Sequence, residues 1–264
     1  MAEIIAQIIH QDLFCFKAPS FGAAACINIG ELFIPIFTGI LPALLWLWYW
    51  LREDPHPEPR KTLIFSFILG MLGVPVALFL EYFLYELVKG LDFSPQTAIS
   101  MTSPLLLLGW AFIEEIVKFQ FAWWGDLKRS VYDEPVDALI YLITVALGFA
   151  ALENVFFLFD LYNETPTIMA LTANLRFFGA NLLHIVSSAT IGVSIAFSFF
   201  HKEHAIRNIW GGIILATLLH WAFNAAIINA AQKIALLETL SVVWTFAIIL
   251  IFIFEKVKKI DPAS

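Results

Sequence analysis

Long apolar stretches constrain this chain more than any other feature of its sequence. The sequence contains several apolar windows of about 20 residues, each long enough to cross the hydrocarbon core of a bilayer as a helix. They lie near residues 31–51, 63–88, 101–125, 136–160, 176–200, 208–232 and 239–256. The chain is 60% hydrophobic and only 14% charged, against roughly 45–50% and 25% in soluble domains. The sequence therefore predicts an all-α polytopic transmembrane helix bundle of about seven spans.

The bundle is predicted to be a single unit. Residues 31–260 contain no repeat, low-complexity tract or soluble domain. In residues 1–30, the helical apolar spacing of EIIAQIIHQDLF predicts a segment that lies along the membrane interface. Cys15 and Cys26 fall in this segment and form no metal or redox motif. A disulfide between them requires that the segment face an oxidising compartment.

Basic residues predict how the bundle is oriented. Loops after odd-numbered spans hold ten of the 15 Lys and Arg residues: Arg52, Arg60, Lys61, Lys128, Arg129, Lys202, Arg207, Lys256, Lys258 and Lys259. The amino-terminal side and the loops after even-numbered spans hold four: Lys17, Lys89, Arg176 and Lys233. Because basic residues mark the cytoplasmic side, we expect the N-terminus outside and the C-terminus in the cytoplasm. No basic tract suggests nucleic-acid binding.

Polar and ionisable residues nevertheless occur inside four of the spans. They are Glu114, Glu115 and Lys118 in the third span, Glu153 and Asn154 in the fourth, Arg176, Asn181 and His184 in the fifth, and His220 and Asn224 in the sixth. Each ionised side chain near the middle of a membrane helix costs about 2.5–3.5 kcal/mol. Such groups normally face the interior of a bundle, where they meet one another or water. Hydrogen bonds that only hold helices together can be made by Ser, Thr, Asn or Gln, without charged groups. This set of ionisable residues therefore predicts a functional site.

Depth and spacing support one shared site. At 1.5 Å per residue, the acids, the histidines and Asn224 lie about 10–20 Å from the outer surface, in one slab. Lys118 lies one helical turn after both Glu114 and Glu115, so it can neutralise either acid and is expected to be a structural counter-ion. His220 and Asn224 are four residues apart and share a helix face.

This set of side chains suits peptide-bond hydrolysis without a covalent nucleophile. A carboxylate beside a histidine can activate water as a general base. A second histidine and an amide donor can stabilise the tetrahedral oxyanion. Arg176, near a span end, either snorkels to the interface, pairs with Glu153 or binds a substrate carboxylate. Arg176 and Asn154 are the candidate substrate-binding residues.

Four segments resemble the PrsW family of bacterial intramembrane proteases, which is related to the type II CAAX prenyl proteases. In chain order they are PALLWLWYWLREDPHPEPRK, EEIVK (an EExxK signature), GFAALENVFF (a GF-x-x-x-EN segment) and HWAFN (an HxxxN signature). The resemblance spans roughly residues 35–255. It implies cleavage of membrane-anchored proteins, with anti-sigma factors cut first on their extracytoplasmic side.

The resemblance also implies roles for single residues. Glu114 becomes the general base with Glu115 as its partner, and His220 and Asn224 match the oxyanion pair. One position departs from the CAAX-type FxxxH pattern, because Phe149 is followed four residues later by Glu153 instead of a histidine. His184 on the next span is the expected source of the missing imidazole.

Two other interpretations stay open. The acids and the two histidines form a donor set that can hold Zn²⁺ with an open position. However, the HExxH signature is absent and Lys118 disfavours a cation, so no cofactor is expected. Buried acids and histidines also form proton relays, so the alternative is a proton-coupled transporter or a non-catalytic scaffold. The expected partners are the lipid bilayer and a single-span membrane protein substrate, in a bacterial cytoplasmic membrane.

Overall fold

The computed structural model describes residues 14–16, 25–27, 29–91, 103–161, 166–229 and 233–260. In chain order the elements are β1 (Phe14–Phe16), β2 (Ala25–Ile27), α2 (Ile29–Leu51), α3 (Arg60–Leu91), α4 (Pro104–Ala122), η1 (Trp123–Leu127), α5 (Asp137–Asp160), α6 (Pro166–Leu175), η2 (Arg176–Ala180), α7 (Asn181–Ala196), η3 (Lys202–His204), α8 (Ala205–Asn229) and α9 (Lys233–Val257). Of these, η1 and η2 are π-helical turns and η3 is a 3₁₀ turn.

The two strands form a short antiparallel pair whose register places Cys15 opposite Cys26. The rest of the predicted interfacial segment lies outside the described residues, and a disulfide between the two cysteines stays a prediction.

Within the described ranges, six helices are long and apolar enough to cross a membrane. α4 has a similar length, 19 residues, but carries three charged side chains. The fifth predicted span begins about ten residues too late, because α6, η2 and α7 form one continuous run from Pro166 to Ala196. The first half of this run has a low hydropathy and therefore does not stand out as a span in the sequence. The polar residues that lower it are Thr167, Thr172, Asn174 and Arg176. Apart from the β1–β2 pair, the described residues form an all-helical, multi-pass bundle.

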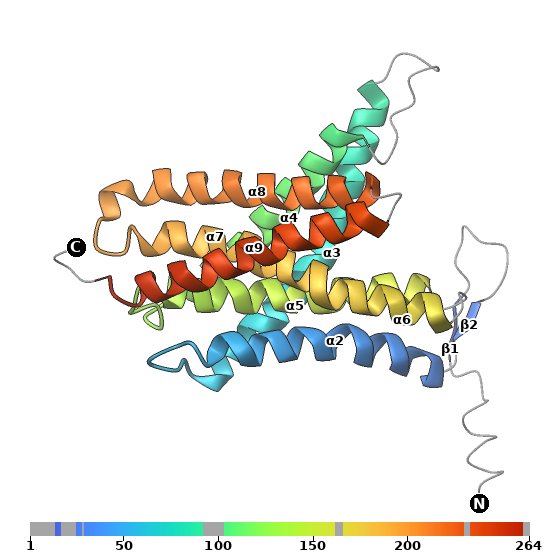
Figure 1. Ribbon diagram of the computed structural model, residues 1–264, viewed down its shortest axis with the longest axis horizontal. Helices are drawn as coiled ribbons and strands as arrows, with labels where there is room; N and C mark the ends of the chain where they lie inside the picture. The colour runs from blue at the N-terminus through green and yellow to red at the C-terminus, as the bar shows by residue number, and fades with distance from the viewer. Residues whose placement is uncertain are drawn as a thin grey trace, which may run out of the picture.

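α5 is the central helix of the bundle. All residues from 136 to 151 are buried, and α5 packs against α2, α3 and α7. Figure 1 shows α2, α5, α7, α8 and α9 running in similar directions, with α3 and α4 inclined across them. A helix that is apolar on every side requires such a position. The predominantly apolar character of the first half of α5 therefore follows from its place in the fold.

Two glycines allow α3 and α5 to cross in backbone contact. A Cβ atom on Gly148 would lie 2.0 Å from the carbonyl oxygen of Phe67, and one on Gly70 would lie 2.0 Å from that of Val145. Neither position can hold a side chain without separating the helices. Such close approach through small residues is typical of helix packing in membranes, and it fixes α5 against α3 near the site described below.

The proline-rich loop between α2 and α3 is fastened to one end of the bundle. Asp54 accepts hydrogen bonds from two backbone N–H groups of this loop. Glu58 accepts a hydrogen bond from the hydroxyl of Tyr141 in α5. Lys258, just after α9, donates to Glu53 over 3.0 Å. The loop is therefore held against α5 and α9, at the end of the bundle that also contains the α7–α8 connection (Figure 1).

Replacing Gly148 with alanine should destabilise the bundle, because the added methyl group meets the Phe67 carbonyl. Overpacking of this kind costs about 1–3 kcal/mol, so the thermal unfolding midpoint of the detergent-purified protein should fall by several degrees. The matched control is Gly211→Ala, since nothing lies within 4 Å of a Cβ at that position. Equal midpoints for the two variants would contradict the close α3–α5 crossing.

Candidate active site

The structure gathers the predicted polar residues around one cavity of about 530 Å³. Its lining includes Glu114 of α4, Glu153 of α5, Arg176 of η2, His184 of α7, and His220 and Asn224 of α8. The remaining predicted residues, Glu115, Lys118 and Asn154, are buried behind this lining. Four helices far apart in the sequence thus contribute to a single polar site, as the slab of similar depths predicted.

The cavity lies toward one end of the bundle. It is lined near the last turns of α5 and α8 and the first turns of α6 and α9, by residues such as Phe157, Thr172, Ile228 and Leu236. The basic loops and the fastened loop between α2 and α3 lie at the opposite ends of these helices (Figure 1).

Glu115 is fully buried and fully hydrogen-bonded. It accepts bonds from Lys118 Nζ (2.6 Å), His220 Nδ1 (2.7 Å), Ser187 Oγ (2.9 Å) and Ser188 Oγ (3.2 Å). A buried carboxylate is stable only when its oxygens are paired and hydrogen-bonded in this way. Glu115 has no contact with the cavity that would let it reach a substrate. It serves as an anchor for its neighbours.

Glu114 has the opposite environment, although it is the adjacent residue. Its Oε2 atom is buried, lacks a hydrogen-bond partner among the described residues, and belongs to a side chain that lines the cavity. The nearest polar atoms are His220 Nε2 at 3.8 Å, Lys118 Nζ at 3.9 Å and His184 Nδ1 at 4.0 Å. Glu114 therefore presents a free acceptor to whatever enters the cavity.

The bond to Glu115 fixes the tautomer of His220. A carboxylate paired with a buried ammonium group only accepts hydrogen bonds, so the proton of the neutral imidazole must lie on Nδ1. The other nitrogen, Nε2, then carries a lone pair and faces Glu114 Oε2 across 3.8 Å. Two acceptors face each other, and only a hydrogen-bond donor or a cation between them can satisfy both.

His184 has partners at both ring nitrogens. Lys118 Nζ lies 3.1 Å from Nδ1 and can only donate. The proton of the neutral ring therefore lies on Nε2, which donates to Glu153 over 3.0 Å. The ring also packs at right angles to that of His220, with centroids 5.2 Å apart. Glu153 occupies the position of the histidine in the CAAX-type pattern. As the sequence predicted, the imidazole of His184 lies beside it.

Arg176 holds Glu153 from the other side. Its Nη2 donates to the Glu153 carboxylate over 2.7 Å and its Nε donates to the Asn154 side chain. Asn154 in turn donates to Asn181 over 3.0 Å. Arg176 lies in the π-helical turn η2, within a continuous helix rather than near a span end, and such turns are frequent at functional sites. Its pairing with Glu153 is one of the alternatives that the sequence left open.

Sequence reasoning missed three contributors. Ser187 and Ser188 of α7, which the sequence does not single out, both donate to Glu115. Their spacing of three and four residues from His184 places them on its helix face and is the signal that could have found them. The third contributor is Glu81 of α3, which lines the same cavity.

The same side chains form a possible metal-ligand set. Glu114, His184 and His220 each offer one ligand atom within 4.8 Å of the others, and two imidazoles with one carboxylate are a known set for catalytic zinc. The orphaned Glu114 oxygen and the free lone pair of His220 fit a cation. His184 fits less well, because Lys118 already occupies its Nδ1 and would place a second positive charge close by.

Replacing Lys118 with methionine should strongly destabilise the protein, since it leaves the buried Glu115 carboxylate without its ammonium partner. Breaking a buried ion pair in this way costs about 3–5 kcal/mol. Adding Glu115→Gln to the same chain should recover part of the loss, because an amide carries no charge. The measurement is the thermal unfolding midpoint, with Lys89→Met as a control at the exposed Lys89–Glu86 pair. A similar effect of Lys118→Met and Lys89→Met would contradict the buried pairing.

Comparison with known proteins agrees with the geometry. Residues 58–253 match the family described as PrsW family intramembrane metalloprotease. Protease PrsW of Geobacillus kaustophilus is 27% identical over 198 residues, covering 73% of this chain and 79% of the relative. Protease PrsW of Bacillus subtilis is 28% identical over 205 residues, covering 73% and 82%. No solved structure matches the chain. The chain therefore belongs to the PrsW family of intramembrane proteases, the family that its motifs resemble.

Proposed function

We propose that this protein is an intramembrane endopeptidase that cleaves membrane-anchored proteins with a water molecule activated by Glu114. The observation that carries the proposal is the Glu114 Oε2 atom, which has no hydrogen-bond partner in the described part of the chain and faces the His220 Nε2 lone pair at 3.8 Å inside a polar cavity. A water molecule between these two acceptors donates a hydrogen bond to each. Glu114 then removes one proton as the water attacks the substrate carbonyl.

The neighbouring residues supply the other steps of such a reaction. Asn224 lies one helical turn from His220 and lines the same cavity, so its amide can donate to the oxyanion. Because Glu115 holds the Nδ1 proton of His220, this histidine joins Asn224 as an oxyanion donor only when its Nε2 is also protonated. In this proposal the Glu153–His184 pair delivers a proton to the leaving amine, and the bond from Arg176 to Glu153 supports that role.

Access from the extracytoplasmic side is part of the proposal. The cavity lies toward the end of the bundle opposite to the basic loops, and basic residues mark the cytoplasmic face. With the N-terminus outside and the C-terminus inside, a single-span substrate of the bacterial cytoplasmic membrane would be cut in its outer half. An anti-sigma factor receiving its first, extracytoplasmic cut fits this geometry.

A metal-dependent form of the same hydrolysis is the second candidate. The family is described as a metalloprotease family, and Glu114, His184 and His220 would be the ligands. A bound metal ion would lower the pKa of a water ligand and polarise the substrate carbonyl. In this case His184 would have to exchange its bond with Lys118 for the metal, while Glu115 would still orient His220, as carboxylates do for metal-bound histidines.

Replacing Glu114 with glutamine should remove cleavage while preserving the fold, because the side chain faces the cavity and forms no hydrogen bond through Oε2. General bases contribute about 10²–10⁴ in rate. New protein termini should be mapped by mass spectrometry in membranes of cells carrying wild type, Glu114→Gln or the control Glu86→Gln, which alters an exposed carboxyl group. Termini common to wild type and control but absent from Glu114→Gln are expected. Identical patterns in all three, at equal expression, would favour the transporter or scaffold.

Removing metal ions should leave cleavage unchanged if water is activated by Glu114 alone. Isolated membranes treated with 1,10-phenanthroline should still produce the wild-type termini, and the purified protein should contain far less than one zinc ion per chain by mass spectrometry. Stoichiometric zinc in the wild type that is lost in His220→Ala would establish the metal-dependent form instead. The variant Asn224→Ala serves as a control, since Asn224 is not in the ligand set.

A further inference from the structure

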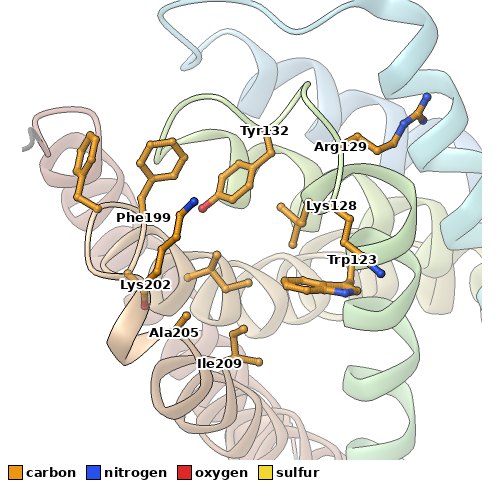
Figure 2. Close-up of a pocket in the computed structure, with 12 residues that line it drawn as sticks. Trp123, Lys128, Arg129, Tyr132, Phe199, Lys202, Ala205 and Ile209 are labelled. Atoms are coloured by element: carbon orange, nitrogen blue, oxygen red, sulfur yellow. The ribbon is translucent and has the colours of Figure 1, made fainter.

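A second cavity, of about 700 Å³, lies at the other end of the bundle. It is bounded by η1, the loop that follows it, the end of α7 and the start of α8 (Figure 2). The candidate spans Thr167–Ala196 and Lys202–Ile228 respectively end and begin at its edge. The cavity shares no lining residue with the site around Glu114. It therefore requires an explanation of its own.

The lining of this second cavity is basic. Lys128, Arg129 and Lys202 belong to it, and its lining contains no acidic residue. Arg129 donates one hydrogen bond to the carbonyl of Gly125 over 3.1 Å. Lys128 and Lys202 have no ion-pair partner among the described residues and border a hollow whose lining holds no acid, so they favour an anionic ligand.

A buried hydroxyl group adds a specific donor. The Tyr132 Oη atom is buried and has no hydrogen-bond partner among the described residues. Its ring packs edge to face against Phe199, with centroids 5.1 Å apart, and Figure 2 shows the Tyr132 hydroxyl and the Lys202 side chain pointing toward each other. Burial, and then the nearby Asp137 carboxylate, raise the pKa of the Tyr132 phenol, so it remains a neutral donor. An unsatisfied buried hydroxyl costs about 1–3 kcal/mol, which a ligand oxygen would recover.

The rest of the wall is apolar. Trp123, Leu127, Ile195 and Ile209 line it beside the basic groups. A free inorganic anion would leave this apolar surface unused, whereas an amphipathic anion would contact both parts. Tryptophan is also typical of the membrane–water interface, where the ends of the candidate spans would lie.

We propose that this cavity binds the headgroup of an anionic phospholipid from the cytoplasmic leaflet. Lys128 and Lys202 pair with the phosphate, the Tyr132 hydroxyl donates a hydrogen bond to a phosphate oxygen, and the glycerol and upper acyl segments lie against the apolar wall. Basic pockets between transmembrane helices on the cytoplasmic side bind anionic lipid headgroups in other proteins. Occupation would brace η1 against the α7–α8 connection.

Lipid binding can be measured without any assay of cleavage, so its result is independent of the proposed protease activity. Phosphatidylglycerol is titrated into the detergent-purified full chain, and bound lipid is counted by native mass spectrometry. The double variant Lys128→Gln/Lys202→Gln should bind about 25-fold more weakly, since each basic residue near a membrane surface contributes roughly fivefold. Tyr132→Phe should weaken binding severalfold while keeping the ring contact with Phe199.

The matched control neutralises two exposed basic residues at the same end of the bundle, Arg60→Gln and Lys61→Gln. If this control loses as much affinity as the double variant, binding reflects diffuse surface charge and the proposed site is wrong. A separate titration with inorganic phosphate identifies the source of the anion. Displacement of the lipid by phosphate at equal concentration would overturn the assignment to a phospholipid. An unchanged thermal midpoint in Tyr132→Phe makes its loss of binding attributable to the hydroxyl group.

Discussion

The ammonium group of Lys118 is the charge on which the arrangement of the site depends. It is fully buried, and it joins Glu115 of its own helix (2.6 Å) to His184 of α7 (3.1 Å). Because it can only donate, it keeps Glu115 as an acceptor and His184 Nδ1 as an acceptor. Glu115 then determines the tautomer of His220, and His184 must donate its remaining proton to Glu153. One cation thus sets the hydrogen-bonding direction of both histidines.

The sequence could predict the contacts of this site that lie within one helix, but not the contacts between helices. Because a helix must be about 20 residues long to cross the bilayer, apolar windows of that length predicted the membrane helices. The i, i+3 and i, i+4 rule correctly placed Lys118 within reach of both acids. It could not decide between Glu114 and Glu115, because that choice depends on Ser187, Ser188 and His220, which come from other helices. Tertiary neighbours make Glu115 an anchor and leave Glu114 facing the cavity.

Arg176 shows the limit of hydropathy more clearly. A hydropathy window that contains an arginine predicts the end of a membrane span, because an isolated charge in lipid is costly. In the structure this charge is paired with Glu153 and bonded to Asn154, and the helix extends ten residues before it. An ion pair between two helices lowers the free-energy cost that a hydropathy window assigns to each charged residue alone. Polar residues that are satisfied by one another are therefore the places where predicted span boundaries fail.

The gap between Glu114 Oε2 and His220 Nε2 can be filled by a polarised water or by a cation, and Lys118 affects the two differently. Its ammonium group lies 3.9 Å from the same carboxylate oxygen. The ammonium group lies beside the carboxylate without forming a hydrogen bond that would block proton transfer to Glu114. It would repel a divalent ion held by the same oxygen. A metal site in this cavity would therefore need Lys118 to turn toward Glu115 alone, whereas a water site needs no rearrangement of the side chains.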